Sequence, residues 1–129
     1  MLEQNRFYTR QEIAHQHGGS TIEYLPCVDG RIVCACLRTE RAFNPQAPCV
    51  ILPGRGARRE SLAAILCAQI GCIPIYLRRG NHRWEYVGDF EVENSSQRPG
   101  DLADYGRFTG RPVTRVIRMK ARSNGKCVD

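Results

Sequence analysis

Apolar and polar residues alternate along the chain in short blocks, and the first block predicts a helix. Thr9 followed by Glu12 fits a capping box, in which each side chain satisfies a backbone N–H group at the start of a helix. We expect this helix to run to about His17 and to stop at Gly18-Gly19, because glycine readily adopts the left-handed conformation that ends many helices. Residues 1–8 are expected to form a short lead-in.

A hairpin and several further strands are predicted by short runs of apolar residues. Asp29-Gly30 separates the runs 24–28 and 31–37, and this dipeptide is a strong hairpin signal because type I′ turns need positive φ at both positions. Within the later segment 84–92, Trp84 and Tyr86 are expected to share one face of a strand. The remaining strands are expected at residues 49–52, 73–77, 84–92 and 113–119.

The clearest helical periodicity lies between the strands expected at 49–52 and 73–77. The pattern predicts a helix that packs one side on the sheet and ends at Gly71. A shorter helix is expected around Leu102–Tyr105. The residues at helical spacing in the first of these segments are Leu62, Ile65, Leu66, Gln69 and Ile70.

Six short strands with one good helix between the third and the fourth predict an α+β fold. We expect a strongly curved, mostly antiparallel sheet or a small β-barrel with two to three helices. A doubly wound parallel fold would need more crossover helices. The chain has 129 residues, the usual size of one domain, so a single domain is expected over residues 1–120. Residues 121–129 are expected to be a flexible tail or the start of a linker.

The net charge of +6 comes from an uneven choice of basic residues, 17 Arg and only 2 Lys. Guanidinium groups form paired hydrogen bonds with phosphate and with guanine edges, and they stack on bases. The charge therefore favours a nucleic-acid partner. A GC-rich genome that replaces Lys by Arg is the alternative explanation, and an interaction domain for an acidic protein partner also stays open.

The seven cysteines favour reduced thiols in the core of a cytoplasmic protein, because their number is odd and several lie in apolar stretches. Cys34-x-Cys36 would point both thiols to one face of a strand. We interpret this pair as core packing, because no second pair lies at structural-zinc spacing. No run of apolar residues approaches the roughly 20 residues of a membrane span, so no membrane partner is expected.

No complete catalytic constellation is visible, so we predict no enzymatic activity within this chain, no cofactor and no metal. Zinc deaminases need His-x-Glu and Pro-Cys-x-x-Cys, but Pro48-Cys49 is followed by Leu52 and no His-x-Glu occurs. Gly54-x-Gly56 follows a strand and opens a helix, yet the Walker Gly-Lys-Ser/Thr is missing. The Rossmann pattern lacks its third glycine, since residue 59 is Arg59.

Two loops concentrate basic residues in a way that suits binding to a polyanion, and we expect them to meet at the mouth of one curved sheet. Residues 53–59 place three arginines and two glycines between a strand and a helix, where free N–H groups attract an anion. Residues 78–83 place cations beside Trp84 and Tyr86, which suits phosphate neutralisation combined with base stacking. Solvated turns with Trp84 and Tyr86 in the core are the alternative. The expected nucleic-acid contacts are Arg10, Arg55, Arg58, Arg59, Arg78, Arg79, His82 and Arg83.

The order of the segments within about residues 49–92 resembles the SRA/YDG family of PUA-like barrels, which read modified cytosine in DNA. In that family a Tyr-Thr-Gly-Ser-Gly turn, a helix, a Pro-Val-Arg-Val-Ile-Arg strand and a Tyr-Asp-Gly-x-Tyr-x-Val strand occur in the same order. The corresponding segments here are 51–56, 73–78 and 84–92. The signature stands as Tyr86-Val87-Gly88, without its Asp, and Leu52-Pro53 replaces Tyr-Thr in the turn.

The resemblance implies a divergent domain that recognises modified bases by flipping them out of DNA into a pocket walled by an aromatic ring. It also implies that the domain is the reader for a fused or associated nuclease of restriction or defence. Modified duplex DNA is the favoured partner. An RNA-binding PUA-like module is the alternative, and a small enzyme acting on a phosphorylated substrate ranks below it. The expected base-pocket residues are Tyr24, Pro53, Gly54, Gly56, Tyr76 and Tyr86.

Overall fold

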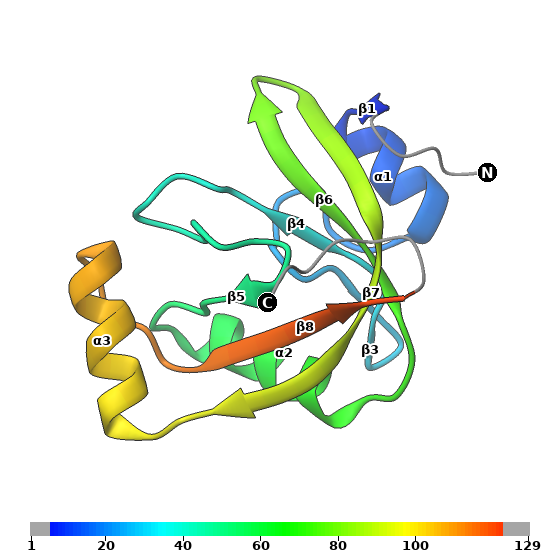
Figure 1. Cartoon of the computed structure of the whole chain (residues 1–129). Helices are drawn as coiled ribbons and strands as arrows, with labels where there is room; N and C mark the ends of the chain where they lie inside the picture. The colour runs from blue at the N-terminus through cyan, green and yellow to red at the C-terminus, as the bar shows by residue number, and fades with distance from the viewer. Residues whose placement is uncertain (1–5, 123–129) are drawn as a thin grey trace.

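The computed structural model describes residues 6–122, which form three helices and eight strands (Figure 1). The helices are α1 (Arg10–His17), α2 (Ala57–Ala68) and α3 (Pro99–Thr109). The strands are β1 (Phe7–Tyr8), β2 (Cys27–Val28), β3 (Arg31–Ile32), β4 (Ala35–Leu37), β5 (Val50–Ile51), β6 (Ile73–Gly80), β7 (Arg83–Ser96) and β8 (Val116–Ala121).

Six strands form one mixed sheet in the order β4-β6-β7-β8-β5, with β1 paired to β7 outside this path. β4 and β6 are parallel, and the other pairs of this sheet are antiparallel. The prediction of an α+β fold with a mostly antiparallel sheet and up to three helices is therefore confirmed. Hydrogen bonds do not join the edge strands β4 and β5 within residues 6–122, so the described sheet stays open and does not form a closed barrel.

The sheet carries apolar side chains on both faces, and each face is covered differently. On β6, Ile75 and Leu77 belong to the main core with α2, whereas Tyr76 between them packs with Ile13 of α1. This alternation is the period of two that a strand imposes on its side chains. Figure 1 shows the two helices accordingly, α2 beneath the sheet and α1 beside the β6–β7 hairpin.

Strand β7 changes its inward face part of the way along its length. Trp84 and Tyr86 pack on the α1 side, but Phe90, also an even position, lies in the main core. The pairing with β6 shifts register between these positions, where Ile75 is opposite Gly88 and Tyr76 is opposite Tyr86. A bulge of this kind inserts one residue and turns the following side chains to the other face.

Most predicted elements are present, with changes at their ends. The capping box of Thr9 and Glu12 is formed, and Asp29 and Gly30 have the positive φ values of 52° and 76° expected for the turn. The prediction of one strand over residues 31–37 is wrong in part, because the chain leaves β3 at Ile32 and pairs again as β4 on β6. The prediction that this helix ends at Gly71 is also wrong: α2 stops at Ala68, and Ile70 is 90% exposed.

The C-terminal third is more regular than the sequence predicts. The short helix expected around Leu102–Tyr105 extends over α3, and β8 continues to Ala121, one residue past the predicted domain boundary. The rest of the predicted tail, residues 123–129, lies outside the described residues. Across residues 6–122, no helix combines the length and the apolar character needed to cross a membrane.

The expectation of reduced thiols is wrong for Cys49, which is disulfide-bonded. Which cysteines meet depends on how distant segments fold together, and spacing along the chain does not reveal this. Among the described residues, the free cysteines are Cys27, Cys34, Cys36, Cys67 and Cys72.

The Gln69 side chain connects α2 to the β2–β3 hairpin. Its amide oxygen accepts the Ile32 N–H at 2.8 Å and its amide nitrogen donates to the Ile32 carbonyl at 2.9 Å. Because Ile32 is fully buried, no water can replace these two bonds. The Gln69 side chain therefore makes the two hydrogen bonds to the Ile32 backbone that a neighbouring strand would otherwise make.

We expect Gln69→Ala to lower the free energy of unfolding by about 2–4 kcal/mol, because it leaves one buried donor and one buried acceptor unsatisfied. Urea unfolding followed by circular dichroism measures the change. Gln97→Ala is the control, because Gln97 is exposed and donates one hydrogen bond of 3.3 Å, and it should change stability by less than about 0.5 kcal/mol. Equal effects of the two substitutions would contradict the role of Gln69.

Candidate nucleic-acid interface

The first basic cluster lies at the tip of the β6–β7 hairpin, and we call it the hairpin cluster: Arg6, Arg78, Arg79, His82 and Arg83. Arg83 stacks on the Phe7 ring with 4.2 Å between guanidinium carbon and ring centre, and Arg6 lies 5.1 Å from the centre of the Tyr8 ring. Arg79 is paired, since its Nε donates to the Glu85 carboxylate at 2.7 Å. The short strand β1 pairs with β7, so these rings join the hairpin to the N-terminal segment.

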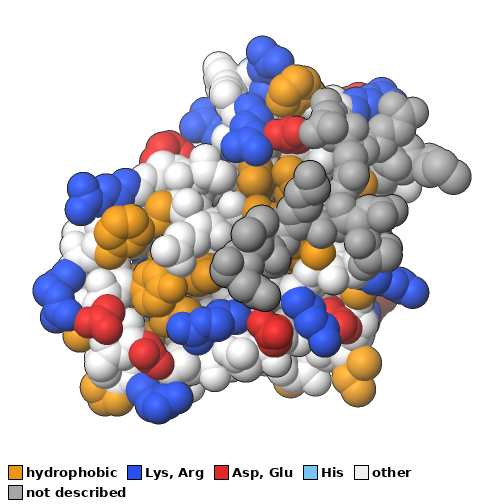
Figure 2. Space-filling view, in the orientation of Figure 1, with side chains coloured by type: hydrophobic (Ala, Val, Ile, Leu, Met, Phe, Trp, Pro, Cys, Tyr) orange, Lys and Arg blue, Asp and Glu red, His pale blue; other side chains and the backbone are white. Residues whose placement is uncertain are grey.

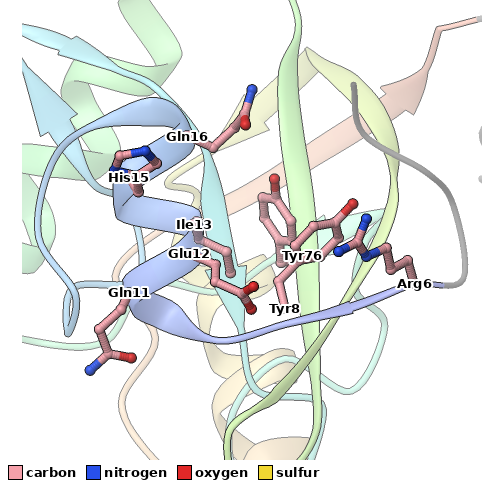
Figure 3. Close-up of a pocket in the computed structure, with 8 residues that line it drawn as sticks. All are labelled: Arg6, Tyr8, Gln11, Glu12, Ile13, His15, Gln16 and Tyr76. Carbon is pink, nitrogen blue, oxygen red and sulfur yellow. The ribbon is translucent and has the colours of Figure 1, made fainter.

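A hollow of about 450 Å³ opens next to this cluster, between α1 and β1. Figure 3 shows Glu12 and Ile13 of α1 facing Tyr8 and Tyr76, with Arg6 on the far side of the two rings. This volume lies within the range of small-molecule sites. The lining residues are Arg6, Tyr8, Gln11, Glu12, Ile13, His15, Gln16 and Tyr76.

The predicted stacking residues near this hollow are mostly buried. Tyr76 is 0% exposed, and its hydroxyl is 2.6 Å from Nε2 of His17. Tyr86 and Trp84 are each 8% exposed, and the Tyr86 hydroxyl donates to Asp89 at 2.7 Å. Burial is the main reason why the pKa of both tyrosines is raised. The ring that faces the hollow from β1 is Tyr8, which lies in the segment predicted as a lead-in and was not among the predicted site residues.

The second basic cluster lies around the turn between β5 and α2, and we call it the turn cluster: Arg55, Arg58, Arg59, Arg111 and Arg115. The turn itself is held rigidly, because the Pro53 carbonyl accepts hydrogen bonds from both N and Oγ1 of Thr114. Gly56 has a φ of 140°, a conformation that favours glycine. Two of the predicted base-pocket residues, Pro53 and Gly56, thus shape a tight turn.

Arg111 and Arg115 bring the turn cluster together, although they stand far from the turn in the sequence. Arg59, Arg115 and Arg111 all act electrostatically on the Tyr24 hydroxyl, whose pKa burial raises. Burial and the neighbouring Arg59 lower the pKa of Arg111. The Tyr24 hydroxyl donates to the Arg59 carbonyl at 2.6 Å, which fixes the ring against the first turn of α2.

Two carboxylates beside the turn are already bound to its own groups. Glu23 pairs with Arg58 at 2.6 Å, and Glu60 accepts the Gly56 N–H at 3.0 Å. None of the ion pairs among residues 6–122 includes Arg59, Arg111 or Arg115. Three guanidinium groups are thus held near one another without a carboxylate partner, and this arrangement favours an anion.

The two clusters do not converge on one opening. Figure 1 shows the hairpin tip at one end of the molecule and α2 with its preceding turn at the other. Of the predicted base-pocket residues, Tyr76 lines the hollow, whereas Tyr24, Gly54 and Gly56 lie beside the turn cluster. The remaining predicted contact, Arg10, ties down a loop: its Nη2 donates to the carbonyls of Ser20 and Glu23, and the guanidinium packs over Trp84.

No group of three or more His, Cys, Asp and Glu side chains within residues 6–122 is arranged to hold a metal ion.

His17 gives the α1 side of the sheet a measurable response to pH. Burial lowers the pKa of His17 below its ordinary 6.5, while the Asp89 carboxylate opposes this effect. Because the unfolded state binds the proton more readily, the contribution of neutral His17 to stability is present above pH 6.5 and is lost as the pH falls. Relative to His17→Gln, the native protein should therefore lose stability between pH 7.5 and pH 5.5. Urea midpoints of both proteins at each pH measure this, and parallel midpoints would contradict the assignment.

Comparisons with known proteins give no family for this chain. It matches no family model, no curated protein and no solved structure. The geometry of the two clusters and the hollow is therefore the basis for assigning a function.

Proposed function

We propose that the chain is a nucleic-acid-binding domain that docks phosphates on the hairpin cluster and takes a base into the neighbouring hollow. The observation that carries this proposal is the juxtaposition of exposed cations, an aromatic ring and a hollow with hydrogen-bonding walls on one side of the molecule. Phosphate neutralisation by Arg supplies affinity, whereas contacts with the base supply selectivity. The hairpin cluster and the hollow would divide these two tasks.

The hollow suits a base that has left the helical stack. A flipped base is read by stacking and by hydrogen bonds to its edge. Tyr8 supports the stacking, and the side chains of Glu12, Gln16 and Arg6 support the edge contacts with acceptors and donors. The Glu12 carboxylate already accepts the Thr9 N–H at 2.8 Å, and this bond holds one acceptor in place at the wall.

The ligand that we favour is duplex DNA carrying a modified base, because the sequence resembles the SRA/YDG family. In this proposal the domain has no catalytic residues and acts in the cytoplasm as the reader for a nuclease of restriction or defence. Structured RNA is the competing ligand, since the same cations would bind its phosphates. The binding panel below separates the two.

We expect the full chain to bind duplex DNA containing 5-methylcytosine or 5-hydroxymethylcytosine at least about fivefold more tightly than the unmodified duplex. Fluorescence anisotropy at several salt concentrations, with a hairpin RNA in the same panel, measures this. Tyr8→Ala should remove the preference for the modified duplex. Arg83→Ala should weaken binding to all duplexes alike, and should reduce the slope of log affinity against log salt concentration by about 1.

The matched control is Arg107→Ala. Arg107 is exposed on α3, away from the hollow, and pairs with Asp104, so its loss should leave binding unchanged. Equal affinity for every duplex would contradict recognition of a modified base. Tighter binding to the RNA would make structured RNA the ligand instead of DNA. The absence of any binding would overturn the proposed function.

A further inference from the structure

The turn cluster adjoins a second surface that the hairpin cluster and the hollow leave unused. Arg111 connects the two, because its guanidinium donates to the carbonyls of Ala42, Phe43 and Leu52 at 2.5, 2.6 and 2.8 Å. These bonds pack the loop between β4 and β5 against the turn before α2. The loop therefore presents its side chains next to Arg59 and Arg111.

Two phenylalanines of this region are exposed, each with an arginine on its ring. Phe43 is 36% exposed with Arg38 at 4.2 Å from its ring centre, and Phe108 is 41% exposed with Arg41 at 5.3 Å. Arg41 also donates from Nε to the Phe108 carbonyl at 2.9 Å, which joins the loop to the end of α3. Both rings thus belong to one surface, and Figure 2 shows apolar side chains bordered by basic ones on this side of the molecule.

The charge of this surface is positive and largely uncompensated. Arg38 is paired with Glu40 at 2.7 Å, but none of the ion pairs within residues 6–122 includes Arg41, Arg59, Arg111 or Arg115. An acidic ligand is therefore favoured over an apolar one. The exposed aromatic rings favour a nucleic acid among acidic ligands. Its phosphates bind cations, and the flat faces of its bases stack on aromatic rings.

We infer that the turn cluster with Phe43 and Phe108 is a binding site for unpaired nucleotides of a single strand. Base faces are covered inside a duplex and become available only where nucleotides are unpaired. Phosphates contact Arg59 and Arg115, and successive bases stack on the Arg–Phe pairs of the loop and α3. Arg111 adds positive charge to the site, but its guanidinium is bound to the carbonyls of Ala42, Phe43, Leu52 and Pro112. This site shares only its class of ligand with the proposed function, and it uses none of the side chains around the hollow.

The test compares the binding of a labelled oligothymidine of about 15 nucleotides and of a blunt duplex of equal length by fluorescence anisotropy. Phe43→Leu and Phe108→Leu remove the rings but keep apolar volume, so the fold is preserved. Each should weaken single-strand binding about fivefold to tenfold with an unchanged salt slope, and should change duplex binding less than about twofold. Arg59→Ala with Arg115→Ala should weaken single-strand binding and lower its salt slope by about 1.4.

The control is Ile70→Ala, because Ile70 is apolar and 90% exposed but follows the C-terminal end of α2, away from the turn cluster. Ile70→Ala should leave oligothymidine binding unchanged. Oligothymidine binding that is absent, or that falls equally in Ile70→Ala and in the two test variants, would overturn the inference. Loss of duplex binding alone would instead overturn the proposed function and leave this site standing.

Discussion

Strand β7 is the element on which the other strands depend, because it contributes pairing to three of them. β6 occupies one edge along its first half, while β1 and β8 share the opposite edge end to end. The bulge near Gly88 lets this single strand face α1 with Trp84 and Tyr86 and the main core with Phe90. Both cores and the position of the hairpin tip thus follow from the path of one strand.

A second constraint is the large share of the chain that runs as loops between short strands. Loop carbonyls need donors, and guanidinium groups can serve several at once. Arg10 holds the segment after α1, Arg31 donates to the Ile70 carbonyl at 2.6 Å, and Arg111 closes the loop between β4 and β5. Part of the Arg-rich composition therefore has an architectural use, and only the remaining arginines are available to a ligand.

The local features of the fold could be predicted from the sequence, because short-range chemistry determines them. The capping box of α1, the turn at Asp29-Gly30 and the alternating faces around Trp84 depend on neighbouring residues only. The parallel pairing of β4 with β6 could not be predicted, because nothing in a three-residue apolar run shows which distant segment it will join.

The candidate sites show the same division. The cations of each loop were visible as runs in the sequence, but Arg111 and Arg115 reach the turn only through folding. Tyr8 and Arg6 reach the hollow through the pairing of β1 with β7. The expectation that both loops meet at one opening assumed that one curved sheet would bring them to its mouth. The described sheet is open, and its two basic ends lie apart.

The shared edge of β7 also governs how the chain could be rearranged. The Arg6 carbonyl accepts the N–H of Tyr86, and the N–H of Arg122 donates to the Asp89 carbonyl, so the first and last described residues lie a few positions apart on one strand. Their closeness permits a circular permutant in which the two present ends of the chain are joined and new ends are opened in an exposed loop. In such a chain β1 would follow directly on β8, and its pairing would no longer carry the entropy cost of closing a loop through most of the protein.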